Sequence, residues 1–222
     1  MPGAFEQLLA DRYSCRAFLP RPVERAMIER ILEIAQRTPS WCNAQPWQVH
    51  IASGAATERL RAALVEAAES GPAAPDYPFP REYRGVYLER RRECGWQLYE
   101  SVGIRRGDRD GSARQALENF RLFGAPHAAI VSTDEALGIY GVLDCGAWVN
   151  NFMLAARSLG VASIAQAALA SRPAALRRFF AIGEERRIVC GISFGYEDAR
   201  HPANAFRTRR AGLDEVAVWR ET

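Results

Sequence analysis

The sequence predicts a single domain of the α+β class, and three observations support this prediction. Its 222 residues suit one compact domain that can bury a sizeable core. Hydrophobic residues make up 48% of the chain and charged residues 25%, as in ordinary globular proteins. Segments with helical periodicity and segments typical of strands follow one another without the regular β–α–β rhythm of a doubly wound fold. We therefore expect residues 1–222 to form one α+β domain.

The first third of the chain contains three expected helices and one strand. The clearest helix spans residues 23–37, because apolar residues recur along it at i, i+3, i+4 and i+7 and a proline follows its end. Shorter helices are expected over residues 4–11 and 56–69, and a strand over residues 47–52. The prolines between residues 70 and 80 predict a loop or the start of an inserted cap.

The remaining elements mix helices and strands. In chain order we expect a charged helix over 82–101, a glycine-containing charged loop over 103–111, a short helix ending at 123, a strand over 128–133, an apolar helix over 136–158, a strand over 161–166, a helix over 173–180 and a strand over 187–195. Gly160 is expected to stop the apolar helix. Residues 197–212 are polar, and residues 213–219 alternate weakly between apolar and polar side chains. This pattern suggests an arm that pairs with a partner subunit.

Composition excludes several classes of location and site. The N-terminus has no basic start followed by an apolar run, and no apolar stretch approaches the length of a membrane span, so we expect a cytoplasmic protein that does not enter membranes. Five widely spaced cysteines without a C-x-x-C pair favour reduced thiols over a disulfide framework or a zinc ribbon. Three scattered histidines predict no metal site.

The charged residues narrow the possible partners. A net charge of +3 without a basic stripe argues against a nucleic-acid-binding module. No G-x-G-x-x-G motif follows a strand, so a Rossmann nucleotide site is not indicated. All 29 basic residues are arginine, which excludes a Schiff-base lysine and a Walker A lysine. Any phosphate site must therefore use arginine, backbone N–H groups and hydroxyls.

Two arginine-rich segments could bind an anion. Arg12-Tyr13-Ser14-Cys15-Arg16 follows the first helix, and its two arginines flank a serine. Asn204-Ala205-Phe206-Arg207-Thr208-Arg209-Arg210 lies in the polar tail. The planar guanidinium of arginine meets two phosphate oxygens at once, so each segment is a possible anion clamp. Taken alone, a segment of this kind is more often a solvated basic loop.

A third segment, Pro39-Ser40-Trp41-Cys42-Asn43-Ala44-Gln45-Pro46-Trp47, lies between a helix and a strand. Its Asn and Gln amides can donate and accept hydrogen bonds at once, which suits the edge of a heterocycle with alternating N–H and C=O groups. Its prolines would stiffen the loop. The alternative is an ordinary proline-rich connection closed by aromatic side chains.

Together and in this order, these segments resemble the FMN-dependent nitroreductase family. The shared features are R-x-S-x-R near the N-terminus, then P-S-x-x-N-x-Q-P-W, and R-T-x-R before L-D-E-V in the tail. The stretch from Gly191 to Tyr196, followed by His201-Pro202, is also similar, so the resemblance covers essentially the whole chain. It implies a central, mostly antiparallel sheet flanked by helices, in an intertwined homodimer that exchanges C-terminal arms (residues 197–222).

The resemblance also implies which residues hold FMN. Arg12, Tyr13, Ser14 and Arg16 would hold the phosphate and ribityl side, with Arg207 and Arg210 completing the phosphate clamp. Pro39, Ser40, Trp41 and Asn43 would reach the flavin from the other subunit.

A short strand over residues 164–168 would line the flavin ring. Relatives often carry proline there, followed by an acidic or amide residue and glycine, whereas this chain has Ala165, Gln166 and Ala167. Backbone contacts to the ring are compatible with that change. Residues 72–111 would form a variable lid, in which Tyr83, Trp96 and Tyr99 shape the pocket for a small aromatic substrate. The strings E-R-R-R-E and G-I-R-R-G-D-R in this insert are similar to the branch that acts on nitrobenzoate.

The function implied is the NAD(P)H-dependent reduction of nitroaromatic or quinone-like compounds by a ping-pong mechanism. No catalytic side chain is required, because the flavin carries the chemistry. Two alternatives on the same scaffold are a reductive dehalogenase and an enone reductase. An alternative of another class is a flavin-binding protein without turnover.

Overall fold

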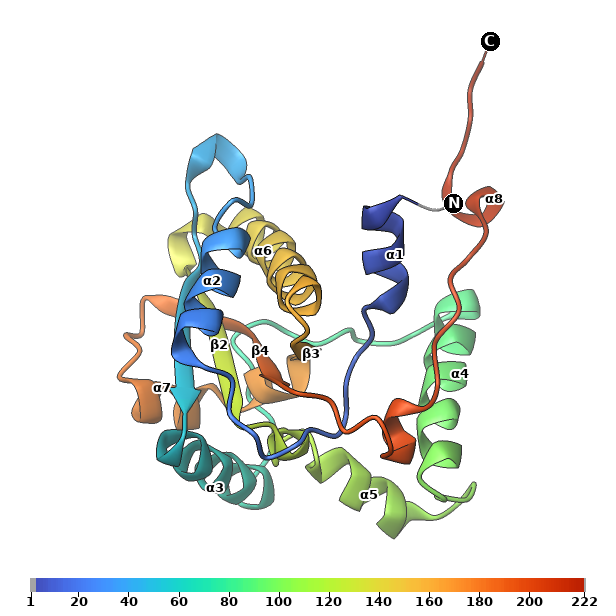
Figure 1. Cartoon of the computed structure of the whole chain (residues 1–222), viewed down its shortest axis with the longest axis horizontal. Helices are drawn as coiled ribbons and strands as arrows, with labels where there is room; N and C mark the ends of the chain where they lie inside the picture. Colours follow the sequence, from blue (N-terminus) through green and yellow to red (C-terminus); the bar gives the residue numbers. More distant parts are fainter. Residues whose placement is uncertain (1–2, 222) are drawn as a thin grey trace.

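The computed structural model describes residues 3–221, which form a four-stranded antiparallel sheet with helices on both faces (Figure 1). The strands are β1 (Gln48–Ser53), β2 (His127–Asp134), β3 (Ala162–Gln166) and β4 (Arg186–Gly195), in the order β1-β2-β4-β3. Each neighbouring pair is antiparallel. The α+β class and the antiparallel sheet predicted from the sequence are confirmed, and all four expected strands are present.

One face of the sheet is covered by α2 (Arg25–Ala35) and α6 (Gly138–Ser158). Aromatic side chains fill this layer. Phe152 of α6 packs on Trp148 of the same helix and on Phe194 of β4, with ring centroids 5.4 Å apart in each pair. The predicted stop of α6 is confirmed, since Gly160 follows its end with a φ of +76° that favours glycine.

The other face is covered by α3 (Ala55–Glu69) and α7 (Pro173–Phe180). Leu60 and Leu64 of α3 and Leu176 of α7 are buried against Ile130 of β2. Because both faces are covered, β2 is buried along nearly its whole length. This explains why its central residues, 128–131, form an uninterrupted apolar run instead of alternating with polar residues.

The segment between α3 and β2 contains α4 (Gly85–Ser101) and α5 (Arg109–Leu117). The expected loop over 103–111 was too long, because Asp108 accepts a hydrogen bond from the backbone N–H of Gly111 at 2.8 Å and starts α5 there. The helix expected to end at Phe123 stops at Leu117, and a short 3-10 turn over Leu122–Gly124 follows. α4 has no buried residue and stands apart from the sheet (Figure 1).

The N-terminal and C-terminal segments contact each other before the last part of the chain extends away from the sheet. α1 (Ala4–Asp11) precedes an extended segment in which Phe18 bridges Glu197. Farther along, Leu213–Val216 forms the short helix α8, which the carboxylate of Glu215 starts by accepting from the N–H of Gly212 at 3.3 Å. The pairing of this tail with a partner subunit stays a prediction. Along the described chain, no helix is both long and apolar enough to cross a membrane.

Candidate functional site

The arginine segment at the N-terminus lies along the edge of β3. Ser14 forms a parallel bridge with Ser163, and the backbone N–H of Cys15 donates to the carbonyl of Ser163 at 3.2 Å. Cys15 is fully buried, whereas Arg12, Ser14 and Arg16 remain partly exposed. The segment therefore extends the sheet by one short bridge and presents its polar side chains to one side of that edge.

Asn204 brings the arginines of the tail to the same place. Its side-chain oxygen accepts the backbone N–H of Arg16 at 2.7 Å. Its amide nitrogen donates to the carbonyls of Ala17 and Asp198, each at 2.9 Å. The side chain is buried, and its bonds to Arg16 and Ala17 join the two segments. The sequence placed Asn204 in the arginine-rich motif but did not reveal this role.

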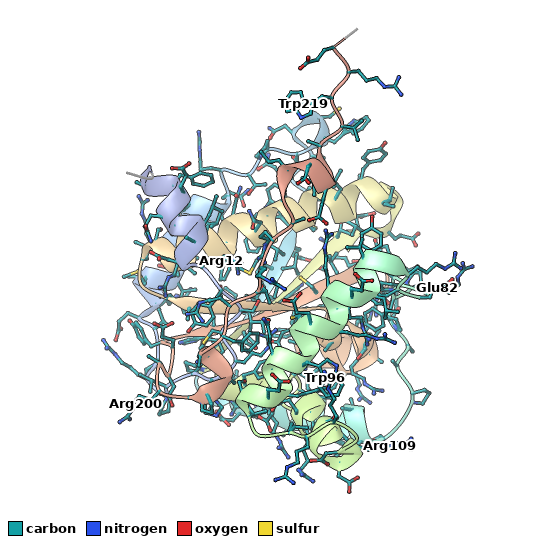
Figure 2. All side chains as sticks on the ribbon, turned by 90° about the vertical axis from the view of Figure 1, so that its right-hand side faces the viewer. Arg12, Glu82, Trp96, Arg109, Arg200 and Trp219 are labelled. Atoms are coloured by element: carbon teal, nitrogen blue, oxygen red, sulfur yellow. The ribbon has the colours of Figure 1, made fainter. Side chains whose placement is uncertain are left out.

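The joined segments enclose a pocket of about 280 Å³. Its polar lining is Arg12, Tyr13, Ser14, Arg16, Arg207, Thr208 and Arg210. In Figure 2, Arg12 lies beside the C-terminal segment. The guanidinium of Arg207 lies over the Tyr13 ring, 3.6 Å from its centroid. Arg12, Ser14 and Arg16 thus share one cavity with Arg207 and Arg210. That they bind the phosphate of FMN stays a prediction.

The electrostatics of this pocket favour an anion. Burial lowers the pKa of Arg12, and the nearby charge of Arg210 lowers this pKa further. Burial likewise lowers the pKa of Arg16. Within residues 3–221, none of the four arginines pairs with a carboxylate, although many other arginines of the chain do. Partly desolvated like charges stabilise a bound anion because it replaces their mutual repulsion with attraction.

Tyr13 is also fixed in this pocket. Its hydroxyl donates to the carboxylate of Glu197 at 2.5 Å, and Glu197 in turn lies 3.6 Å from the guanidinium of Arg157. Burial, followed by the hydrogen bond to Glu197, raises the pKa of Tyr13 well above its usual value. The phenol is therefore neutral, and its ring serves as a platform for Arg207.

The end of β3 next to this pocket exposes small side chains. Ala165 and Ala167 are exposed, whereas Gln166 is buried between them. The Gln166 amide donates to the carbonyl of Asn119 at 2.9 Å and accepts from the Ser193 hydroxyl at 2.5 Å. The predicted strand over 164–168 is too long, since β3 ends at Gln166 and a 3-10 turn covers Ala167–Ser171. Any contact of Gln166 with a cofactor would come from its backbone.

The proline-flanked loop lies elsewhere in the subunit, against the start of α6. The backbone N–H of Trp41 donates to Asp144 at 3.0 Å, and the Trp41 ring packs on Tyr140 with centroids 4.5 Å apart. Ser40 accepts the N–H of Gln45 at 2.9 Å. The loop, with Pro39 and Asn43 exposed, lines no pocket with the arginines within one subunit.

The predicted lid aromatics lie on α4 and just before it. The rings of Trp96 and Tyr99 pack edge to face at 5.7 Å, and Arg91 lies over Tyr83 at 5.2 Å. None of the three lines the arginine pocket or the cleft of about 840 Å³ beside it. Their role at a substrate pocket stays a prediction.

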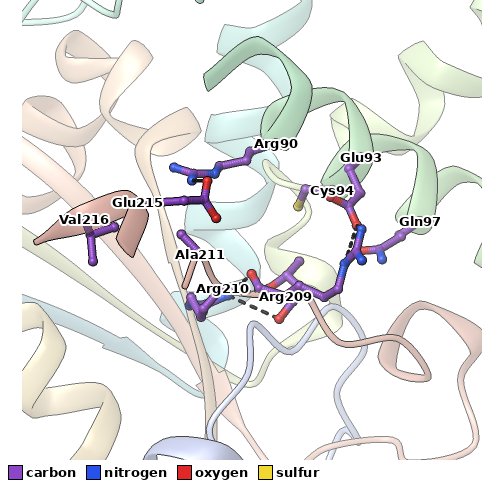
Figure 3. Close-up of a pocket in the computed structure, with 10 residues that line it drawn as sticks. Arg90, Glu93, Cys94, Gln97, Arg209, Arg210, Ala211, Glu215 and Val216 are labelled. Atoms are coloured by element: carbon purple, nitrogen blue, oxygen red, sulfur yellow. Dashed lines mark hydrogen bonds and ion pairs between the residues drawn. The ribbon is translucent and has the colours of Figure 1, made fainter. Parts of the chain in front are cut away.

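That cleft lies between α4 and the C-terminal segment (Figure 3). The α4 residues that line it include Arg90, Cys94 and Gln97, which sequence reasoning missed. Their i, i+4, i+7 spacing places them on one face of the helix and was the signal available to find them. Cys94 and Arg210 line both cavities, so the cleft and the arginine pocket adjoin.

Comparison with known proteins agrees with this geometry. The sequence model of the nitroreductase family matches residues 9–196. The chain is 35% identical to the 4-nitrobenzoate reductase of Pseudomonas putida over 206 residues, covering 93% of this chain and 91% of that protein. It is 37% identical to the nitroreductase NfnB of Mycolicibacterium smegmatis, covering 96% and 91%.

The fold matches a solved structure equally well. The crystal structure of the FMN-dependent nitroreductase NfnB from Mycobacterium smegmatis, in complex with NADPH, superposes with a TM-score of 0.94 at 35% identity, covering 98% of each chain. The match includes the sheet, the helices on its two faces and the insert that carries α4.

Proposed function

Because this chain belongs to the nitroreductase family, we propose that it is an FMN-dependent oxidoreductase that uses NAD(P)H to reduce nitroaromatic or quinone-like compounds. The single observation that carries this proposal is the pocket in which Arg12, Arg16, Arg207 and Arg210 converge without a carboxylate partner among the described residues. The four positive charges of this cavity favour a doubly charged anion that has hydrogen-bond acceptors on several sides.

The phosphate of FMN meets this requirement. It is a dianion whose oxygens accept from the forked guanidinium groups, and the Ser14 hydroxyl adds a donor to the same cavity. Tyr13 would pack against the ribityl chain while it supports Arg207. The small exposed side chains of Ala165 and Ala167 leave room for a flat ring at the end of β3, with Gln166 contributing backbone groups only.

The active form is proposed to be a homodimer. Large apolar side chains are exposed near the start of α6, among them Ile139 at 79% and Leu143 at 65%, next to the loop that holds Trp41. Contiguous exposed apolar surface of this kind marks an interface. In the dimer, Pro39, Ser40, Trp41 and Asn43 would reach the cofactor held by the partner, which accounts for their distance from the arginine pocket within one subunit.

FMN, when bound, would supply the hydride and electron transfer between NAD(P)H and the acceptor. The protein's part is to bind and orient: the arginines hold the phosphate, and the β3 edge with the partner loop fixes the ring. Donor and acceptor would use one site in turn, which predicts ping-pong kinetics. The insert over 72–111, with Tyr83, Trp96 and Tyr99, is proposed to cover that site, and the cytoplasm stays the predicted location.

The deciding experiment is an absorption spectrum of the purified protein, followed by anaerobic addition of NADPH and then 4-nitrobenzoate. We expect flavin bands that bleach with NADPH and recover with the nitroaromatic acid, and parallel double-reciprocal plots in the steady state. Flavin that binds but does not bleach would favour a non-catalytic flavin protein. Bleaching with recovery only by haloaromatic or enone acceptors would point to the other reactions on this scaffold. A protein that takes up no FMN would refute the proposal.

A further inference from the structure

Two ion pairs join α4 to the C-terminal segment on either side of Arg210 (Figure 3). Glu93 of α4 accepts from the Nε and Nη2 atoms of Arg209, at 3.0 and 2.7 Å. Arg90, one helical turn earlier, donates to the carboxylate of Glu215 at 2.9 Å. The pairs flank the residue that closes the arginine pocket.

Building on the proposed function, we infer that Glu93 and Arg90 are positioning residues for the FMN site. They hold residues 209–215 against α4, so that Arg210 stays directed at the phosphate pocket it shares with Arg12. They touch neither the cofactor nor the reacting atoms. Their effect passes through the C-terminal segment.

We call the ion pairs Glu93–Arg209 and Arg90–Glu215 the clasp. The local contacts of the tail explain why these pairs are needed. The backbone hydrogen bonds of residues 205–217 are all local, as in the bond from Ala217 N–H to the carbonyl of Leu213. Among the described residues, Arg210 donates only to its neighbours, Thr208 Oγ1 at 2.9 Å and the carbonyls of Thr208 and Arg209. Arg207 lies over the Tyr13 ring, and farther along the tail the pairs to α4 fix residues 209–215 to the rest of the molecule.

Electrostatics add a second reason. Arg210 lies near enough to Arg12 to help lower the pKa of that side chain, so the two guanidinium groups repel each other when no anion is bound. This repulsion pushes the tail outward. Glu93 and Arg90 oppose it by pulling the neighbouring residues Arg209 and Glu215 toward α4.

The clasp also couples the insert to the cofactor. α4 has no fully buried residue, and the two ion pairs add to the packing of its half-buried residues 93–99 in holding it to the body. A ligand that draws Arg210 into the pocket stabilises the pairs, and the pairs in turn strengthen binding of that ligand by the same factor. Binding of FMN is thus expected to order α4.

The expected effects are modest because the pairs are partly exposed, with 82% of the Arg209 side chain and 40% of the Glu93 side chain open to solvent. Exposed pairs of this kind are worth a factor of about two to five in affinity, and the effect shrinks at high salt. The test therefore uses a charge exchange as well as single substitutions.

The experiment measures the Kd of the flavin-free protein for FMN by fluorescence titration at low and high salt. Glu93→Gln and Arg209→Gln are each expected to raise the Kd about two- to five-fold at low salt, with no further loss when combined. The exchanged variant Glu93→Arg with Arg209→Glu is expected to return the Kd close to the wild-type value. Glu29→Gln, which breaks a comparable exposed pair with Arg25 on α2, is the matched control and should leave the Kd unchanged.

Arg12→Ala separates this inference from the proposed function. It removes a direct phosphate donor and should raise the Kd about ten-fold or more. If Arg12→Ala has that effect while the Glu93 and Arg209 variants match the control, or the exchanged variant is no better than the singles, the positioning role is overturned and the FMN site stands. If Arg12→Ala leaves the Kd unchanged, the phosphate assignment itself is overturned, and the clasp falls with it.

Discussion

His127 shows how single contacts fix a residue's charge. The backbone N–H of Val23 donates to its Nε2 atom at 2.8 Å, so the ring proton must sit on Nδ1, which lies 2.9 Å from the Ser53 hydroxyl. The side chain is 2% exposed and stacks on Phe194. A proton on Nε2 would break the bond from Val23, and burial lowers the pKa of His127. The folded protein therefore holds this imidazole neutral.

This predicts a specific acid sensitivity. The unfolded chain protonates this histidine near pH 6.5, whereas the folded chain does not until a lower pH. The unfolded state then binds more protons, so the stability that neutral His127 contributes is present above about pH 6.5 and is lost as the pH falls toward the folded-state pKa. Urea unfolding of the flavin-free protein at pH 7.5 and 5.5 should show a smaller loss of unfolding free energy for His127→Gln than for wild type.

Some acid sensitivity should survive in His127→Gln, because burial and the charge of Arg186 also lower the pKa of His50. Identical pH dependence in wild type and His127→Gln would contradict the assignment.

At the scale of elements, the proline-rich connection before α4 is anchored by Asp76. Its two carboxylate oxygens accept from Arg177 of α7 at 3.1 and 2.8 Å, and one also accepts the backbone N–H of Ile188 at 2.7 Å. The Arg177 and Asp76 side chains are only 10% and 9% exposed. The connection is therefore fixed to α7 and β4.

Asp76→Ala should destabilise the fold by about 3 kcal/mol, because it leaves the largely buried guanidinium of Arg177 without its bidentate partner. Chemical denaturation of the flavin-free protein measures this. Glu29→Ala, which breaks an exposed pair, should change the unfolding free energy by less than about 0.5 kcal/mol. A loss for Asp76→Ala no larger than that of the control would show that the ion pair does not anchor the connection.

At the scale of the whole molecule, the two halves of the predicted site lie on different parts of one subunit. The arginines meet at the edge of β3, while the loop with Asn43 packs on the start of α6. In a symmetric dimer, a complete site forms only where the arginines of one subunit meet the loop of its partner. The proposed homodimer therefore predicts that each site contains residues from both subunits, and this can be tested.

Coexpression of two defective subunits tests this arrangement. One subunit carries Arg12→Ala with Arg16→Ala, the other carries Asn43→Ala, and different affinity tags isolate the mixed dimer. We expect FMN content of about half the wild-type level in the mixed dimer, because one of its two sites is intact, and lower content in each parent. Mixed dimers no better than either parent, or a protein that sediments as a monomer, would contradict the shared site.

The sequence by itself determined the class of fold and the chemistry available to the site. Periodicity located the helices over 25–35, 55–69 and 173–180 and the four strands to within about two residues, because each buries a face whose spacing follows its own local geometry. The absence of lysine left arginine as the cation for any phosphate. The order of three short motifs was enough to indicate the family, since each motif is local in the chain.

Only the tertiary structure decided which of these residues meet. Arg16 and Asn204 are 188 positions apart, and nothing local in either segment encodes their contact, which follows from how the chain ends lie beside β3. Gln166 turned inward because Asn119 and Ser193 satisfy its amide there. The face of α4 that meets the tail is set by two ion pairs with distant partners. Long-range contacts depend on sheet register and packing, and a local pattern carries no record of either.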